Sequence, residues 1–183
     1  MTTDDDRASD EHDGAPPVRY ALWIRGRLRT TVTLGDATGG HVADLSLHGW
    51  PRKRRRLRAA AEDADWTVAV RPGELTVDRD GERRMTVRGD AVELGDRRLT
   101  WPALDGGVDR VALTDPDDDR VLLVVTAADG GSDEPVAILD VAADLPDPQA
   151  VALAACAVEL ITRPRGRMTD GLDPAVGFDI AIP

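Results

Sequence analysis

The sequence predicts a mainly β protein, in which a closed antiparallel barrel surrounds one apolar helix near the C-terminal end. The first observation is the segment 148–162, where no polar side chain interrupts the run from Ala150 to Val158. The second is a series of about ten short strand-like segments that precede it. A helix that is apolar all round must be buried. Because closure into a barrel removes exposed strand edges, a barrel around the helix accounts for both observations.

The boundaries of the expected helix are marked in the sequence. Asp147 can cap it, since its carboxylate can accept a free N–H group of the first turn, and Pro148 suits the first helical position. Arg163 precedes Pro164, and a residue before proline is driven away from the helical conformation. A helix of 15 residues spans about 22 Å, whereas a bilayer needs about 20 residues. The sequence therefore favours a helix enclosed by protein, with no transmembrane segment.

The strand pattern depends on alternation of apolar and polar residues and on short turns. Asp80-Gly81 is a favoured pair for a type I′ hairpin turn, and Gly89 and Gly95 suit the first position of type II′ turns. Strands joined by such turns form an antiparallel meander. The expected strands are 18–24, 28–34, 41–47, 66–70, 74–78, 85–87, 92–94, 97–101, 108–113, 121–126, 136–141 and 176–182, with a turn at 35–40.

A short additional helix is expected at 52–65. The arginines and alanines of this segment have good helix propensity. Its basic residues come first and its acidic residues last, which is unfavourable for the helix dipole.

The chain resembles the tubby-like superfamily, which includes the LURP-one-related and phospholipid scramblase proteins. The resemblance is carried by the many-stranded order with turns such as Arg79-Asp80-Gly81-Glu82, and by Ala137–Val141 leading into 147–161. It covers residues 18–164 and implies a barrel of about twelve strands around a C-terminal hydrophobic helix. Members of the family bind phosphoinositides or membranes, or have no known activity. The residues after Pro164 depart from the family, in which the helix usually lies close to the C-terminus.

The expected domain organisation has three parts. Residues 1–17 are polar and acidic and cannot bury enough apolar surface to offset the entropy of ordering, so they are predicted to form a disordered tail. Residues 18–164 are the barrel domain, and 165–183 are a C-terminal extension. Acidic residues at 4–6 occupy the place where a signal peptide would need basic and apolar ones. The expected location is cytoplasmic, at the membrane periphery if the chain binds lipid.

Composition excludes several function classes. The formal net charge of −11 argues against general nucleic-acid binding, which needs a basic footprint. The one cysteine, Cys156, allows no intrachain disulfide and is expected to be a buried thiol in the helix. His12, His41 and His48 with that cysteine cannot provide a zinc-ligand spacing, and the glycine pairs fit no nucleotide-binding motif. No metal and no cofactor are expected.

A run of basic residues is the candidate binding site. It comprises Arg52, Lys53, Arg54, Arg55, Arg56 and Arg58, beside Trp50, which could sit at a membrane interface. Clustered arginines can clamp phosphates bidentately, and on an acidic protein they would stand out electrostatically. Because a helix inside the barrel leaves no lumen, binding is expected on the outer surface. The alternative is a solvated segment that pairs with nearby acids such as Glu62, Asp63 and Asp65.

The expected function is a non-enzymatic binding or scaffold role, with anionic membrane lipid headgroups as the specific partner. One alternative is a protein-interaction module that uses the acidic surface and tail. A hydrolase using Ser46 and His48 is a weaker alternative, because Asp44, Ser46 and His48 share a strand face but no Gly-x-Ser-x-Gly elbow is present. The segment 115–119 begins like a calcium loop, but Arg120 and Thr126 replace the required glycine and glutamate, which predicts a hairpin turn.

Overall fold

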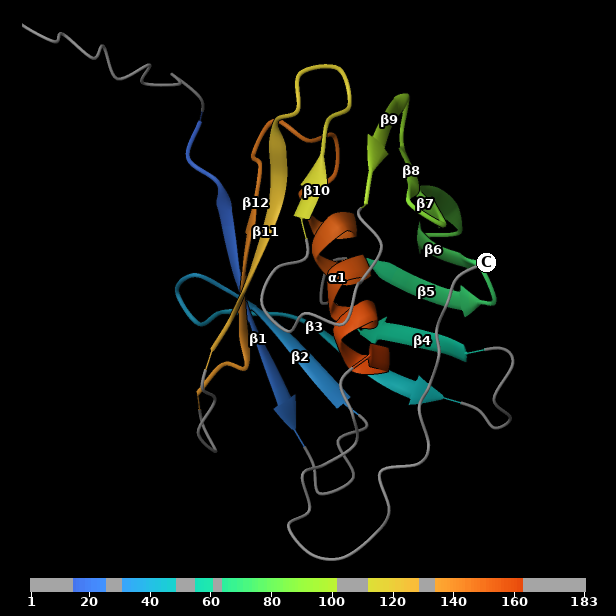
Figure 1. Ribbon diagram of the computed structural model, residues 1–183. Helices are drawn as coiled ribbons and strands as arrows, with labels where there is room; N and C mark the ends of the chain where they lie inside the picture. The colour runs from blue at the N-terminus through green and yellow to red at the C-terminus, as the bar shows by residue number, and fades with distance from the viewer. Residues whose placement is uncertain are drawn as a thin grey trace, which may run out of the picture.

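The computed structural model describes residues 15–25, 31–48, 55–60, 64–101, 112–128 and 134–162, with the backbone alone at 25, 46–48, 55–60, 112 and 159–162. This part of the chain contains twelve strands followed by one helix (Figure 1). In chain order they are β1 (Val18–Arg25), β2 (Thr31–Asp36), β3 (His41–His48), β4 (Arg55–Ala60), β5 (Asp65–Arg71), β6 (Glu74–Arg79), β7 (Glu82–Arg88), β8 (Ala91–Leu94), β9 (Arg97–Thr100), β10 (Ala112–Thr114), β11 (Val121–Ala127), β12 (Ala137–Val141) and α1 (Pro148–Thr162).

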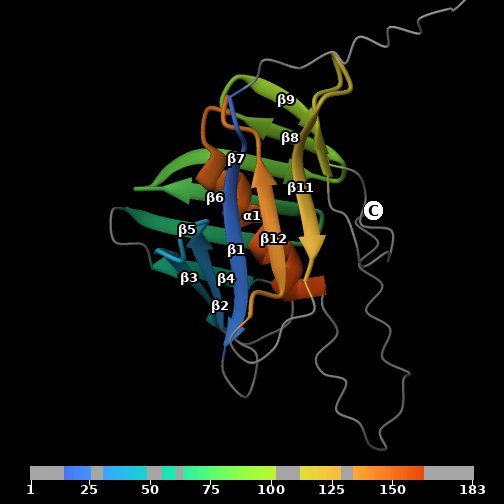
Figure 2. The ribbon, with the colours of Figure 1, turned by 90° about the vertical axis from the view of Figure 1, so that its left-hand side faces the viewer.

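The strands form one antiparallel sheet in which consecutive strands are neighbours. The order returns on itself, because β1 pairs with β2 on one side and with β12 on the other, in a register that runs from Val18↔Val141 to Leu22↔Ala137. Figures 1 and 2 show α1 between β1, β11 and β12 on one side and the strands from β4 to β7 on the other. The prediction of a mainly β protein with one apolar helix is confirmed.

The ladder is weakest between β9 and β10, where Thr100 and Thr114 form the single residue pair within the described segments. Pro116 lies two residues beyond this pair, in the turn after β10, and proline has no N–H group to donate. The β10 register also shifts between Leu113 and Thr114. We call this place the β9–β10 seam. The described part of the ladder is one pair long here, so full closure of the predicted barrel stays a prediction.

The core lies between α1 and the inner face of the sheet. From Ala150 to Ala157 every α1 residue is at most 1% exposed, so the helix has no solvated side over these turns. The helix contributes mainly alanine and the strands contribute large side chains, including Trp66, Met85 and Leu139. Small helix residues allow the strand side chains to approach closely, and a fully buried leucine such as Leu153 contributes about 1.5–3 kcal/mol.

The helix α1 begins and ends at the residues that the sequence predicts. The helix spans Pro148–Thr162, as predicted, and Asp147 Oδ1 accepts a hydrogen bond from the Ala150 N–H at 3.1 Å. A cap of this kind contributes about 1 kcal/mol. Cys156 is buried and forms no disulfide, which confirms the expectation for that residue. Within the described residues no helix has the length and apolarity needed to cross a membrane.

The tight turns also follow their sequence signals. Asp80 and Gly81 have φ values of 53° and 83°, and a type I′ turn requires a positive φ at both positions. Gly89 and Gly95 have φ values of 60° and 57°, the sign that a type II′ turn requires at its first central residue. These turns set the register of the meander from β6 to β9.

The expected helix at 52–65 is wrong. Residues 55–60 form β4 and β5 begins at Asp65. The β4 backbone pairs with β3 and β5 on its two sides, and helix propensities differ by less than about 1 kcal/mol per residue, so sheet pairing prevails. The expected turn at 35–40 is shorter than predicted, because β2 continues to Asp36.

Several predictions lie outside the described residues. They are most of the tail at 1–17, the extension at 165–183 and the strand at 176–182. The domain boundaries at 18 and 164 therefore stay predictions.

Candidate functional site

The predicted binding residues are divided between β4 and the segment before it. Arg55, Arg56 and Arg58 belong to β4, where the structure describes the backbone. Trp50, Arg52, Lys53 and Arg54 lie outside the described residues, as do Glu62 and Asp63.

The register of β4 places two of these arginines on one face. Arg56 is opposite Ala69 and Arg58 is opposite Thr67, and residues directly opposite each other on antiparallel strands share a face. Trp66 and Val68 of β5 alternate with these residues, so they belong to the other face, where both are fully buried. Arg56 and Arg58 therefore occupy positions on the outer face, about 7 Å apart along the strand.

The acidic residue closest to these positions on β6 already has a partner. Asp78 lies opposite Thr67, so it shares the outer face with Arg58. Its carboxylate accepts a hydrogen bond from the Arg83 guanidinium of β7. Asp78 is therefore neutralised by a residue on the side away from β4.

The acidic residue on the β3 side is engaged as well. Asp44 Oδ1 accepts a hydrogen bond from Thr33 Oγ1 at 2.6 Å, and Asp44 Oδ2 lies 3.3 Å from His41 Nε2. In a nucleophilic triad the histidine stands between the hydroxyl and the carboxylate, whereas here the carboxylate stands between the other two. The Asp44 carboxylate thus orients its neighbours. Of Ser46 and His48, the structure places only the backbone, opposite Arg58 and Arg56.

The acidic segment after β10 forms the turn predicted for it. Asp115 Oδ1 accepts the Asp117 N–H at 3.1 Å, and Asp118 Oδ1 accepts the Arg120 N–H at 3.0 Å. The carboxylates are therefore used to stabilise the loop. Within the described segments no group of three or more His, Cys, Asp or Glu side chains is placed to hold a metal ion.

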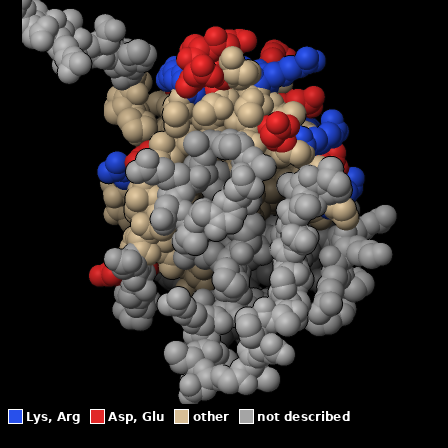
Figure 3. Space-filling model, viewed as in Figure 1, with Lys and Arg blue, Asp and Glu red and all other residues tan. Residues whose placement is uncertain are grey.

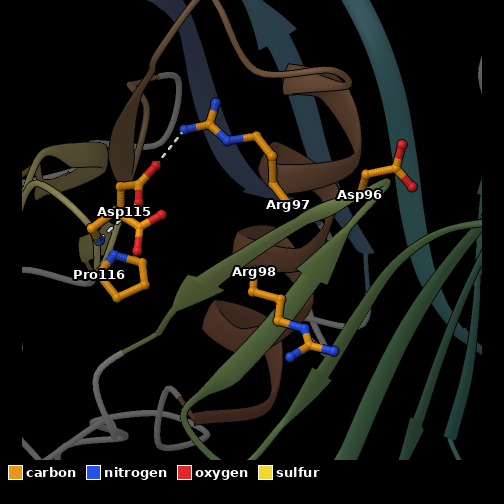
Figure 4. Close-up of a pocket in the computed structure, with 6 residues that line it drawn as sticks. Asp96, Arg97, Arg98, Asp115 and Pro116 are labelled. Atoms are coloured by element: carbon orange, nitrogen blue, oxygen red, sulfur yellow. Dashed lines mark hydrogen bonds and ion pairs between the residues drawn. The ribbon is translucent and has the colours of Figure 1, made fainter.

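A second charged constellation crosses the β9–β10 seam, and we call it the seam cluster. It consists of Arg97, Asp115, Arg120 and Asp144. The Arg97 Nη2 group donates to Asp115 Oδ2 at 2.6 Å, as Figure 4 shows, and Arg97 Nη1 lies 3.8 Å from Asp144 Oδ2. Arg120 binds Asp144 bidentately at 2.8 and 2.9 Å. In Figure 3 the described acidic and basic side chains are interspersed at the top of the molecule.

Sequence reasoning missed this cluster. The ion-paired residues are 18 and 24 positions apart, and the chain brings them together only through the pairing of β9 with β10 and the connection from β12 to α1. No local spacing signals such a contact.

Both carboxylates of the seam cluster are held in the charged form. The hydrogen bond from Arg97 lowers the pKa of Asp115, and the hydrogen bonds from Arg120 lower the pKa of Asp144, each below the ordinary 3.8. A lowered pKa in the folded state gives stability that is present above the unfolded value and lost as the pH falls below it. Both carboxylates are therefore ionised at neutral pH, and their contribution to stability weakens only below about pH 4.

An antiparallel sheet wrapped around a buried helix, with its charged groups on the outside, defines the structural class of this protein. The X-ray structure of a protein from Arabidopsis thaliana is similar over 79% of this chain and 91% of that chain, with a TM-score of 0.50 and 13% sequence identity. At this identity the similarity shows a shared fold. No family model matches the sequence, and no curated protein matches it.

Proposed function

We propose that this protein is a non-enzymatic binding module of the tubby-like, LURP-one-related type, which binds anionic lipid headgroups on the outer face of β3, β4 and β5. The observation that carries the proposal is the register of Arg56 and Arg58, which occupy alternate positions on that outer face. The proposed ligand group is the phosphate of a membrane lipid.

The family assignment and a fully closed barrel are part of this proposal. The ring-like strand order, the pairing of β1 with β12 and the enclosed α1 support it. The shared fold with the Arabidopsis protein agrees with it. In such a barrel the interior is occupied by α1, so a ligand has to bind outside.

The chemistry of the arginine run suits a phosphate-bearing surface. Guanidinium groups stay charged at any physiological pH and bind phosphate oxygens in a planar, bidentate manner. The backbone of β4 pairs on both sides, which fixes the spacing of Arg56 and Arg58. Of the acids in the neighbouring strands, Asp78 is paired with Arg83 and Asp44 accepts a hydrogen bond from Thr33.

The net charge of the whole chain restricts how binding occurs. A protein of charge −11 is repelled by an anionic membrane at long range, so attraction has to come from a local cluster within about a Debye length of 8 Å. Each arginine near an anionic surface contributes about 1 kcal/mol. Binding is therefore expected to need several arginines together and to weaken with salt.

The test is co-sedimentation with liposomes that carry phosphatidylserine or a phosphoinositide, at low and at near-physiological salt. The double variant Arg56→Gln/Arg58→Gln should lose affinity about tenfold or more, since two contacts of about 1 kcal/mol each are removed. The control Arg71→Gln/Arg88→Gln removes the same charge from two exposed arginines that pair with Glu74. The control should bind nearly as the wild type does.

If both double variants lost the same liposome affinity, the loss would reflect general electrostatics, and the proposed site at Arg56 and Arg58 would be rejected. Failure of the wild-type protein to bind either lipid at either salt would reject the function. Phosphoinositide binding without phosphatidylserine binding would identify a headgroup-specific site.

A further inference from the structure

At the seam, the described part of the ladder between β9 and β10 is one residue pair long, Thr100 with Thr114. The Trp101 N–H donates to Asp90 O at 2.6 Å, on the β8 side, and successive residues of a strand point their backbone groups to opposite sides. The backbone groups of Arg98 and Thr100 therefore point toward β10. Thr100 O accepts a 3.4 Å hydrogen bond from Thr114 Oγ1. Pro116, which lines the same pocket as Arg98, has no N–H to donate.

Side chains also connect the two sides, beyond this backbone pair. Arg97 and Asp115 are 30% and 15% exposed, so their hydrogen bond is partly shielded from water. Asp144 is bound by Arg120 and lies near Arg97, which connects β9, the turn before β11 and the loop that leads into α1. Asp115 also accepts the Asp117 N–H, so the turn itself is held in shape.

An open pocket of about 480 Å³ lies at this place. Its lining comes from both sides of the seam, namely Asp96, Arg97, Arg98, Asp115, Pro116 and Asp117. Figure 4 shows Arg97 reaching to Asp115 while Arg98 points away from that contact. A side chain thus bridges the two sides of the pocket.

We propose that the seam cluster is a latch, which holds β9 to the β10–β11 turn beside the single backbone pair described there, and that the sheet opens first at this seam when the latch is broken. The contrast is the Arg83–Asp78 pair, which has the same chemistry but joins β6 and β7 across a ladder of six residue pairs. The latch hypothesis requires the two Arg–Asp pairs to differ in their effect on the strands that they join.

Hydrogen exchange measured by mass spectrometry tests this on the full chain. In Arg97→Gln and in Asp115→Asn, protection of peptides that cover β9 and β10 should fall about tenfold or more, because a partly buried charge-assisted hydrogen bond is lost. Protection of the β1–β12 and β6–β7 peptides should stay at the wild-type level. In the control Arg83→Gln, protection of β6 and β7 should change less than about threefold.

A disulfide cross-link between β9 and β10 provides a second test, which does not depend on the stability of the single variants. Thr100 and Thr114 are directly opposite each other, so the oxidised variant Thr100→Cys/Thr114→Cys should close the seam. In that background Arg97→Gln should no longer reduce protection of β9 and β10. An undiminished effect in the cross-linked protein, or equal effects of Arg97→Gln and Arg83→Gln on their own strands, would overturn the latch.

Discussion

Replacement of Leu153 by aspartate should leave the protein unfolded or insoluble. Leu153 has no exposed surface, and its neighbours Ala152 and Ala154 are equally buried, so the carboxylate could not turn toward water. An unpaired charge in such a place costs several kcal/mol, while the whole stability of a domain is about 5–15 kcal/mol. Size-exclusion chromatography and circular dichroism should show loss of the folded species.

The matched control is Leu153→Met, which keeps the volume and the apolar character of the side chain. It should cost less than about 1.5 kcal/mol and stay folded. A Leu153→Asp variant that melted at the wild-type temperature would place α1 at the periphery and contradict the enclosed helix.

Replacement of Trp66 by alanine should have the second largest effect. Trp66 is the largest fully buried side chain of the sheet, and the Arg79 guanidinium lies 5.3 Å from its ring centroid. Removal of a buried aromatic ring of this size costs about 3–5 kcal/mol. Thermal unfolding followed by circular dichroism should show a midpoint lowered by roughly 10 °C.

The control Trp66→Phe separates the ring from its polar atom. Trp66 Nε1 is buried and has no hydrogen-bond acceptor among the described residues, so phenylalanine removes a desolvated donor along with part of the ring. The loss for Trp66→Phe should therefore be well under half of that for Trp66→Ala. Equal losses would show that the indole nitrogen contributes a favourable contact.

The parts of the fold that follow from the sequence are those with local signals. Asp147 and Pro148 define the start of α1, and Asp80-Gly81 defines a hairpin, because each signal acts within a few residues of its effect. The strand β4 was missed because its sequence has good helix propensity. Its conformation is imposed by pairing with β3 and β5, which no window of sequence contains.

The candidate sites also depend partly on local sequence signals and partly on contacts between distant segments. The arginine run is visible in composition, but the shared face of Arg56 and Arg58 depends on their pairing with β5. The seam cluster has no composition signal at all. Arg97 and Asp144 are ordinary charged residues in the sequence, and their proximity is a product of the fold.

The pairing of β1 with β12 has a consequence for how the molecule reaches its native state. Arg19 and Asp140 bond across these strands although they are 121 residues apart, whereas the meander from β5 to β9 consists of contacts between near neighbours. Joining distant segments carries a large loop-closure entropy, so folding is expected to be slow, on the order of milliseconds to seconds. Stopped-flow refolding followed by tryptophan fluorescence would measure this, and a submillisecond single phase would contradict it. Until β1 meets β12, the apolar surface of α1 lacks part of its cover, which makes that interval the time when the chain is most exposed to aggregation.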